Sequence, residues 1–236
     1  MYLWVYKQVL RRKQLVWQAT SVAEVQEIQQ YFGKRFPIQL IANIPALPLA
    51  QVPRIEKKEK SLKLVCLALI GHMKNHVRLI EVLQASQLPI ELNLYGPIKD
   101  AAYWERCQQL IEQSSAPCRI QYKGSVAPSE IAALLQQYHA SILLSKGENF
   151  GHAIYESLAV GRPVILSDKT PWTFSTPAGA TFSDADDTKL IAHLHTLYNE
   201  EQQAWNMRAQ AALAYAQDYA AQQDLETAYL HLFNNR

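Results

Sequence analysis

The sequence predicts an α/β fold: a Rossmann-like parallel sheet with helices on both faces, preceded by a small separate region. Short apolar segments alternate with helical segments through most of the chain, as in sheets built from strand-helix-strand units. The apolar segments are continuous instead of alternating with polar residues, which is typical of strands buried on both faces. With 236 residues, of which 49% are hydrophobic, the chain is also long enough to form a substantial core.

The small region covers residues 1–44. Its expected elements are a helix at 1–14, a strand at 15–19, a helix that ends at Gly33 and a strand at 37–42. Ser21 and Glu24 have the spacing of a capping box at the start of the second helix. Residues 45–60 are rich in proline and charge, so we expect a linker there and the main domain at 61–236.

The main domain begins with a regular alternation of strands and helices. The expected strands are residues 63–69, 90–95, 119–123, 140–144 and 163–166. The expected helices are residues 74–85, 101–113, 189–198 and 200–233, with two more that start near Pro128 and Gly151. In parallel sheets ligands bind at the carboxyl ends of the strands, so the loops that follow the strands form the candidate site.

The composition argues against several functions. A net charge of +2 gives no strong field for nucleic acid or another polyanion. The basic run at 11–13 can favour an anionic membrane surface, but three charges on a helix are more often a solvated face. The 3 cysteines lack metal-ligand spacing and favour free thiols in a reducing compartment. Because the sequence shows neither a membrane-spanning segment nor a secretion signal, we expect a cytoplasmic protein, at most peripheral to the inner membrane.

The most informative segment begins at Glu148. This residue lies in a loop after a predicted strand, and Glu156 follows on the next helix. The N–H groups and helix dipole near Gly151 and His152 favour a diphosphate, which can approach closely because Gly151 has no Cβ. From about a turn and a half along the helix, Glu156 can accept two hydrogen bonds from a vicinal diol. The alternative is that Glu148 only caps the helix and that Glu156 is solvated on its outer face.

Glu148 through Trp172 resembles the donor-site signature of retaining glycosyltransferases of the GT-B fold, specifically family 4 (group 1). That signature has an acidic residue, Phe-Gly, a helix with a second Glu, and Gly-x-Pro-Val before a strand, and this chain has all of these. The resemblance extends from about Trp17 to the C-terminus, which is only the C-terminal half of a family member. It implies that residues 1–44 are a remnant of the N-terminal acceptor domain, so that the chain is truncated relative to the family.

The resemblance also implies roles for individual residues. Lys74, after the first strand of the main domain, would stabilise the leaving diphosphate, and Glu148 would position the sugar and stabilise positive charge at its reacting carbon. Glu156 would hold the ribose hydroxyls. The other donor-binding residues implied are Phe150, Gly151, His152, Gly71, Gly124, Ser125 and Val126. The donor would be a UDP- or GDP-sugar, with no metal and no further cofactor.

Simpler roles compete with several of these. Lys74 can be a solvated lysine near a helix start, residues 124–126 an ordinary strand-to-helix turn, and His152 a packing or capping residue. The sequence also departs from the family at Leu69, where members usually carry an arginine. One phosphate contact is therefore missing or comes from elsewhere, for instance from Lys146 or Arg162.

Metal binding is not expected at the remaining acidic and histidine pairs. Asp184-Ala185-Asp186 has the form of the metal-binding motif of GT-A enzymes, but it precedes a predicted helix, where aspartates act as caps. His193 and His195 point to different faces of a helix, and His72 and His76 lack an acid or thiol partner nearby.

Two classes of function remain. The first is a donor domain that transfers a hexose with retention in bacterial polysaccharide or glycoconjugate synthesis, either within a longer enzyme or as one subunit of a two-chain transferase. The second is a catalytically silent sugar-nucleotide-binding or scaffold module, favoured by Leu69. The expected partners are a nucleotide-sugar donor and an acceptor domain or a second copy of the chain, and not nucleic acid. The C-terminal helix would dock on residues 1–14 or on that second copy.

Overall fold

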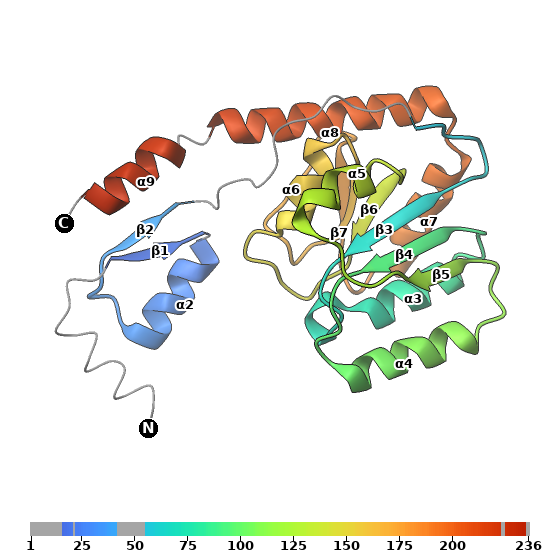
Figure 1. Cartoon of the computed structure of the whole chain (residues 1–236), viewed down its shortest axis with the longest axis horizontal. Coiled ribbons are helices and arrows are strands. Elements are labelled where there is room, and N and C mark those ends of the chain that lie inside the picture. Colours follow the sequence, from blue (N-terminus) through green and yellow to red (C-terminus); the bar gives the residue numbers. More distant parts are fainter. Residues whose placement is uncertain (1–15, 21, 42–54, 223–224, 235–236) are drawn as a thin grey trace. The chain divides into compact units, whose positions relative to one another are not determined.

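The computed structural model describes residues 16–20, 22–41, 55–222 and 225–234 (Figure 1). The chain forms two compact units, one of residues 45–220 and one of residues 1–44 together with 221–236. The last sixteen residues thus group with the N-terminal region and not with the sheet domain that we expected to continue to residue 236. The predicted helix at 1–14, its basic run and most of the predicted linker lie outside the described residues.

The larger unit is built on a six-stranded parallel sheet, which confirms the predicted fold class. Its strands are β3 (Lys63–Leu67), β4 (Glu91–Tyr95), β5 (Arg119–Tyr122), β6 (Ala140–Leu143), β7 (Val164–Ser167) and β8 (Gly179–Phe182). Their order in the sheet is β5-β4-β3-β6-β7-β8. The chain therefore starts in the centre, moves outward to β5, and then crosses back to place β6 on the other side of β3. The edge strand β8 has no counterpart in the sequence prediction.

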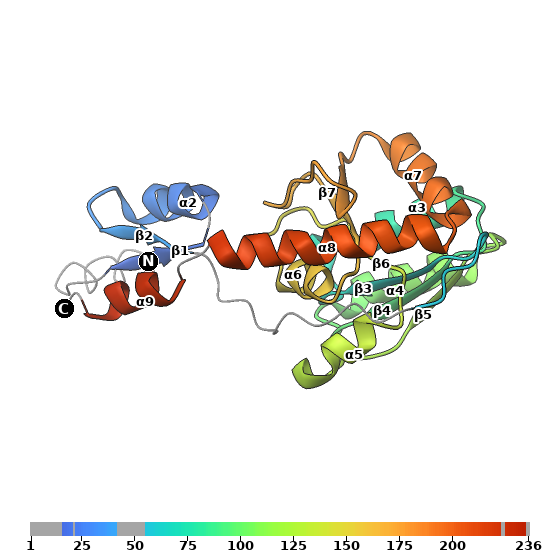
Figure 2. The same cartoon turned by 90° about the horizontal axis from the view of Figure 1, so that it is seen from above.

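Helices cover both faces of this sheet (Figures 1 and 2). The described helices of the larger unit are α3 (His76–Ala85), α4 (Ala101–Glu112), α5 (Ile131–Leu135), α6 (His152–Ala159), α7 (Asp187–Asn199) and most of α8 (Gln202–Gln222). Two short 3-10 turns, η1 (His72–Lys74) and η2 (Pro128–Glu130), precede α3 and α5. Helices α3, α4 and α7 pack together, and α5 packs with α6.

Strand β3 shows why the apolar segments are continuous. Leu64 and Cys66 belong to the same buried cluster as Leu79 of α3, whereas Val65 belongs to a second cluster with Leu135 of α5. Successive side chains of a strand point to opposite faces, so a strand covered on both faces needs apolar residues at every position.

The smaller unit contains the parallel strands β1 (Trp17–Ala19) and β2 (Ile38–Leu40), joined by α2 (Val22–Phe32), and the C-terminal helix α9 (Leu225–Asn234). Gly33, with a φ of 89°, follows the end of α2 as predicted. Glu24 accepts hydrogen bonds from the backbone N and the Oγ1 of Thr20, both at 2.7 Å, while Ser21 lies outside the described residues. The Nε2 of Gln18 lies 2.6 Å from the Tyr229 hydroxyl oxygen, which ties α9 to β1.

Among the described residues, no helix has both the length and the apolar character that crossing a membrane requires.

Candidate functional site

The strand order creates a switch point at the centre of the sheet. Strands β3 and β6 are neighbours, but the chain leaves them toward opposite edges. In sheets of this kind the helices that follow the two strands diverge, and the space beyond their carboxyl ends is where ligands bind. The residues that follow β3 and β6 are therefore the first place to look for a site.

Lys74 and Glu148 meet at this switch point. Lys74 ends η1 after β3, and Glu148 lies in the loop after β6; the Nζ of Lys74 is 2.5 Å from the Oε1 of Glu148. Their side chains are 22% and 9% exposed, so the pair is largely shielded from water. Glu148 contacts a cation from a neighbouring loop and is not a helix cap, because no side chain of the described residues caps α6.

Backbone hydrogen bonds hold the two loops together. The N–H of Lys146 donates to the carbonyl of Met73 at 2.8 Å, and the N–H of Glu148 donates to the carbonyl of Lys169 at 3.3 Å. Gly71, another predicted binding residue, accepts a hydrogen bond from the N–H of Lys74 at 3.0 Å and so closes the η1 turn. The loop after β6 is thus hydrogen-bonded both to the loop after β3 and to the loop after β7.

The N-terminus of α6 is open. Gly151 precedes the helix with a φ of 81°, a left-handed conformation that suits glycine, and no side chain of the described residues caps the helix. In contrast, Asp100 caps α4 and Asp186 caps α7 through backbone N–H groups of their first turns. Helix α6 shares this lack of a side-chain cap with α3, whose N-cap residue Asn75 makes no side-chain hydrogen bond, and its positive end can face a ligand. His152 is exposed in its first turn.

Phe150 is buried and does not present its ring to a ligand. The side chain packs against Trp172 and Tyr219, with ring centroids 5.4 and 6.0 Å away. Its carbonyl accepts a hydrogen bond from the Trp172 indole N–H at 2.5 Å. Any contact of Phe150 with a donor would come from its backbone.

Glu156 is a buried carboxyl group to which the described residues give no partner. The residue is 8% exposed, so the alternative of a solvated outer face is wrong. No hydrogen bond or ion pair to its carboxylate is found in the described part of the chain, and burial raises the pKa of this group. A buried, unpaired carboxylate costs stability, which is typical of a group kept for binding.

The loop of residues 124–126 lies at the same edge but further away. It follows β5, which is separated from β6 by two strands, a lateral distance of about 14 Å at the usual strand spacing. The Gly124 carbonyl accepts a hydrogen bond from the N–H of Gly96 at 2.9 Å, which joins it to the loop after β4. Ser125 is exposed and Val126 half-buried. This loop can contact only a part of the ligand that is distant from Glu148.

The missing arginine is not replaced by Arg162. Arg162 precedes β7, so it stands at the amino end of the sheet, and it is 0% exposed. Its guanidinium donates to the carbonyls of Leu135, Gly161 and Gln136 and lies 5.2 Å from the Trp205 ring centroid. The suggestion that it contacts a phosphate is wrong. Lys146 is exposed at the carboxyl end of β6, and Leu69 is 43% exposed after β3.

The acidic motif near residue 184 has structural partners. Asp184 and Asp187 both bind Arg78, whose side chain is 10% exposed, while Asp186 accepts a hydrogen bond from the N–H of Lys189. The capping interpretation therefore holds for Asp186, and Asp184 forms an ion pair instead. Within the described residues, no three His, Cys, Asp or Glu side chains are grouped so that they can hold a metal ion.

Sequence reasoning missed the environment of His76. Its ring is fully buried, with Nε2 3.8 Å from the Cys66 Sγ and Nδ1 without a hydrogen-bond partner among the described residues. Burial lowers the pKa of His76 to about 4, so the imidazole is neutral. In the sequence, His76 was noted only because it lies four residues after His72. That spacing does not indicate whether the ring is buried.

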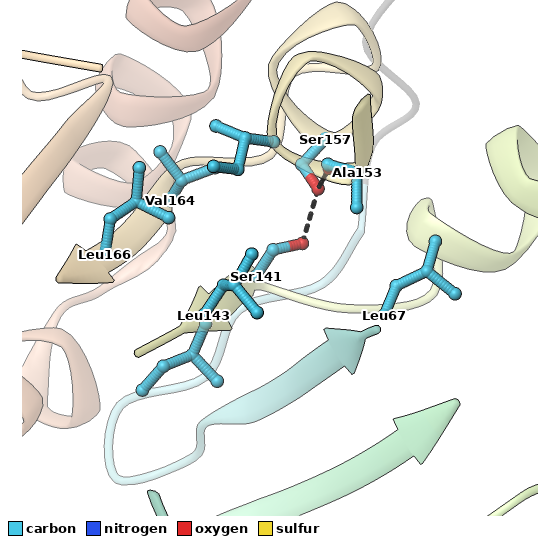
Figure 3. A pocket seen from close by; sticks show the side chains of 9 residues that line it. Leu67, Ser141, Leu143, Ala153, Ser157, Val164 and Leu166 are labelled. Carbon is cyan, nitrogen blue, oxygen red and sulfur yellow. Dashed lines mark hydrogen bonds between the residues drawn. The ribbon is translucent and has the colours of Figure 1, made fainter. Parts of the chain in front are cut away.

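A cavity under α6 is too small to be the site. Figure 3 shows that it lies between α6 and strands β6 and β7, beside the hydrogen bond that joins the hydroxyls of Ser141 and Ser157 at 2.7 Å. Its volume of about 10 Å³ is that of a single water molecule at most.

Comparison with known proteins gives one family match and several structural matches. Residues 50–212 match a family model described as glycosyl transferases group 1. Anabaena Alr3699/HepE, solved with UDP and glucose, has a TM-score of 0.78 at 18% identity, over 98% of this chain and 65% of that one. A mutant of S. aureus TarM, solved with fondaparinux, alpha-GlcNAc-glycerol and UDP, has a TM-score of 0.76 at 16% identity, over 92% and 43%. The GtfA/B complex has a TM-score of 0.64 at 20% identity, over 93% and 45%.

The chain thus spans less than two thirds of the length of these proteins. A search of curated protein sequences finds no match.

Proposed function

The chain belongs to the group 1 glycosyl transferases, and we propose that its larger unit binds a nucleotide-diphosphate sugar and supplies the donor half of a retaining hexosyl transfer, as in family 4. The observation that carries this proposal is the Lys74–Glu148 pair at the switch point, next to the open N-terminus of α6.

The leaving diphosphate is assigned to Lys74 and the start of α6. A departing nucleotide gains negative charge, which a compact ammonium group and free backbone N–H groups stabilise. The contact with Glu148 holds the ammonium group of Lys74 at the switch point, which is where the diphosphate would lie. Exposed Lys146 can supply the contact that Leu69 does not make. The positive charge then comes from the protein, and the proposal needs no metal.

The sugar is assigned to Glu148. Cleavage of the bond between the sugar and the diphosphate leaves positive charge on the reacting carbon, and a shielded carboxylate nearby stabilises it. With a side chain 9% exposed, Glu148 acts in an environment where such an interaction is strong. The acceptor hydroxyl must be activated by groups outside this unit.

The nucleoside is assigned to Glu156 and to residues 124–126. Glu156 has no partner in the described chain, so its carboxylate is available to two vicinal ribose hydroxyls. The loop at 124–126 is placed at the far end of the ligand, where the base would lie. HepE and TarM were solved with UDP, which makes a UDP-sugar the first donor to test and a GDP-sugar the second.

We further infer a place in bacterial polysaccharide or glycoconjugate synthesis, in the cytoplasm or peripheral to the inner membrane. This rests on the family and on the bacterial glycosyltransferase structures that share the fold.

Calorimetric titration tests the donor site. The purified chain is titrated with UDP, GDP, ADP and their glucose conjugates, beside Glu156→Ala and with 2′-deoxy-UDP as a probe of the ribose contact. Saturable binding of one nucleotide that Glu156→Ala and the 2′-deoxy analogue both weaken supports the proposal. Absence of binding by the folded wild type contradicts it. Binding without any transfer would favour the silent module, for which Leu69 is the specific observation.

A two-chain enzyme is the second candidate, because the smaller unit has much uncovered apolar surface. Its side chains that expose more than half of their surface are Val22, Tyr31, Leu40, Leu230 and Phe233. A two-stranded sheet is at best marginally stable by itself, so a further domain would stabilise this unit. One structural relative was solved as a complex, GtfA/B. Co-purification with the product of a neighbouring reading frame, lost in Leu40→Glu, would support this candidate; transfer by the chain alone would contradict it.

A further inference from the structure

An aromatic cluster anchors the loop that carries Glu148. Phe150, two residues after Glu148, packs against Trp172 at 5.4 Å, Tyr219 at 6.0 Å and Tyr155 at 6.4 Å, measured between ring centroids. Trp172 also donates its indole N–H to the Phe150 carbonyl at 2.5 Å. Both the ring and the backbone of Phe150 are therefore held from outside its own loop.

Tyr219 of α8 is the residue that joins these rings. Its ring centroid lies 6.0 Å from that of Phe150, 5.9 Å from Tyr155 and 5.0 Å from Trp172. Helix α8 is also fixed to the Trp172 segment one turn earlier, where the Tyr215 hydroxyl donates to the Thr173 carbonyl at 2.9 Å. Helix α8 thus reaches the loop through packed aromatic side chains, although Tyr219 lies far from that loop in the sequence.

This contact falls at a sensitive point of the backbone. Phe150 is followed at once by Gly151, whose φ of 81° turns the chain from the loop into α6. Because Phe150 lies between Glu148 and that turn, a shift of its ring moves both the carboxylate and the first N–H groups of α6. In a site of this kind, displacements of about 1 Å are enough to change the rate of a reaction strongly.

We propose that Tyr219 is a positioning residue of the donor site, which acts through Phe150 and Trp172 to fix the Glu148–Gly151 loop. The inference rests on the proposed function. The ring is the active part of the side chain, because the Tyr219 hydroxyl has no hydrogen-bond partner in the described residues. Tyr219→Phe is therefore the conservative variant that keeps the effect, and Tyr219→Leu the variant that removes it.

Trp205 offers a matched control on the same helix. It is buried, but it packs against Arg162 and donates to the His139 carbonyl at the amino end of the sheet. Trp205→Leu therefore removes an aromatic side chain from α8 without touching the loop. Trp172→Phe is a second test variant, because it removes the hydrogen bond to Phe150 and keeps a smaller aromatic ring in the cluster.

The experiment measures the affinity for UDP by calorimetry in all variants, at a temperature where circular dichroism shows each one folded. We expect Tyr219→Leu and Trp172→Phe to bind UDP about tenfold more weakly, a change of about 1.4 kcal/mol. Tyr219→Phe should bind like the wild type, and Trp205→Leu should melt earlier yet bind like the wild type. Wild-type affinity in Tyr219→Leu, or an equal loss in Trp205→Leu, would overturn the inference.

A second readout keeps this test separate from that of the proposed function. The Trp172 indole N–H, assigned by Trp172→Phe, can be followed by NMR without any nucleotide. Slow hydrogen exchange of this group in the wild type and fast exchange in Tyr219→Leu would support the anchoring step; equal exchange would overturn it. Failure of the wild type itself to bind UDP, GDP and ADP would instead contradict the proposed function.

Discussion

The Nζ of Lys74 lies 2.5 Å from the Oε1 of Glu148, although 74 positions separate the two residues in the chain. The strand order explains this contact, because β3 and β6 are neighbours at the centre of the sheet and each residue follows one of them. Both side chains are largely shielded from water, and each is an ion-pair partner of the other.

The first prediction concerns the stability of this pair. Lys74→Met leaves a largely buried carboxylate without its cation, which should lower the free energy of unfolding by about 2 kcal/mol, as for other unsatisfied buried groups. Lys63→Met is the control, because its 3.8 Å pair with Glu91 is exposed and such surface pairs contribute roughly 0–1 kcal/mol. Urea unfolding measures both, and equal losses would contradict the assignment.

The second prediction concerns Glu156 and pH. Because burial raises its pKa above 4.5, the carboxylate destabilises the folded chain once the pH rises through that raised value. Glu156→Gln should therefore be more stable than the wild type near neutral pH, and the difference should vanish below about pH 4.5, where both states are protonated. Thermal melting across this range measures it. A variant that is less stable at neutral pH would show that Glu156 has a structural partner.

The architecture could be predicted from the sequence because it depends on local patterns. Continuous apolar segments separated by helices specify a parallel sheet, and the helix starts near residues 101 and 152 follow from their flanking residues. The edge strand β8 was missed because residues 179–182 are not strongly apolar and pair only with β7.

The site could be predicted only in part. The residues of the Glu148 loop were found because they are close together in the sequence, and Lys74 was found by its place after the first strand of the main domain. The buried roles of Arg162 and Phe150 could not be found in this way. Arg162 binds carbonyls of α5, and Phe150 packs against α8, and both contacts depend on elements distant in the chain.

The third prediction separates the two basic residues that flank the site motif. Arg162→Met removes the side-chain donor from the carbonyls of Gly161 and Gln136, and it should lower the free energy of unfolding by about 3 kcal/mol, given roughly 1–3 kcal/mol for each unsatisfied group. Its affinity for UDP should not change. Lys146→Gln should do the opposite, with unchanged stability and weaker UDP binding. Urea unfolding and calorimetry on both variants measure these effects. Weaker UDP binding by Arg162→Met, or unchanged binding by Lys146→Gln, would contradict the assignment.

The fourth prediction concerns acid. Burial lowers the pKa of both His76 and His139 from 6.5 to about 4. Below pH 6.5 the unfolded chain takes up protons that the folded chain does not, so stability should fall as the pH drops toward 4.

His193 is a third ring whose pKa burial lowers to about 4. His139→Gln isolates the share of one ring, because it removes that ring while keeping side-chain hydrogen-bonding groups near the backbone of Glu56 and Lys63. Urea unfolding at about pH 7 and about pH 5 should show a smaller loss in the variant than in the wild type. An identical loss would mean that His139 does not contribute.

The most direct test of the donor site is a calorimetric titration with UDP of the wild type, Lys74→Gln and Lys63→Gln. Lys63 begins β3 and Lys74 follows its carboxyl end, so the two variants remove the same charge from opposite ends of the strand. If Lys74 binds the diphosphate, the wild type and Lys63→Gln bind UDP with the same affinity and Lys74→Gln binds it at least about tenfold more weakly, a change of about 1.4 kcal/mol. Equal affinity in all three proteins would contradict a diphosphate site at the Lys74–Glu148 pair.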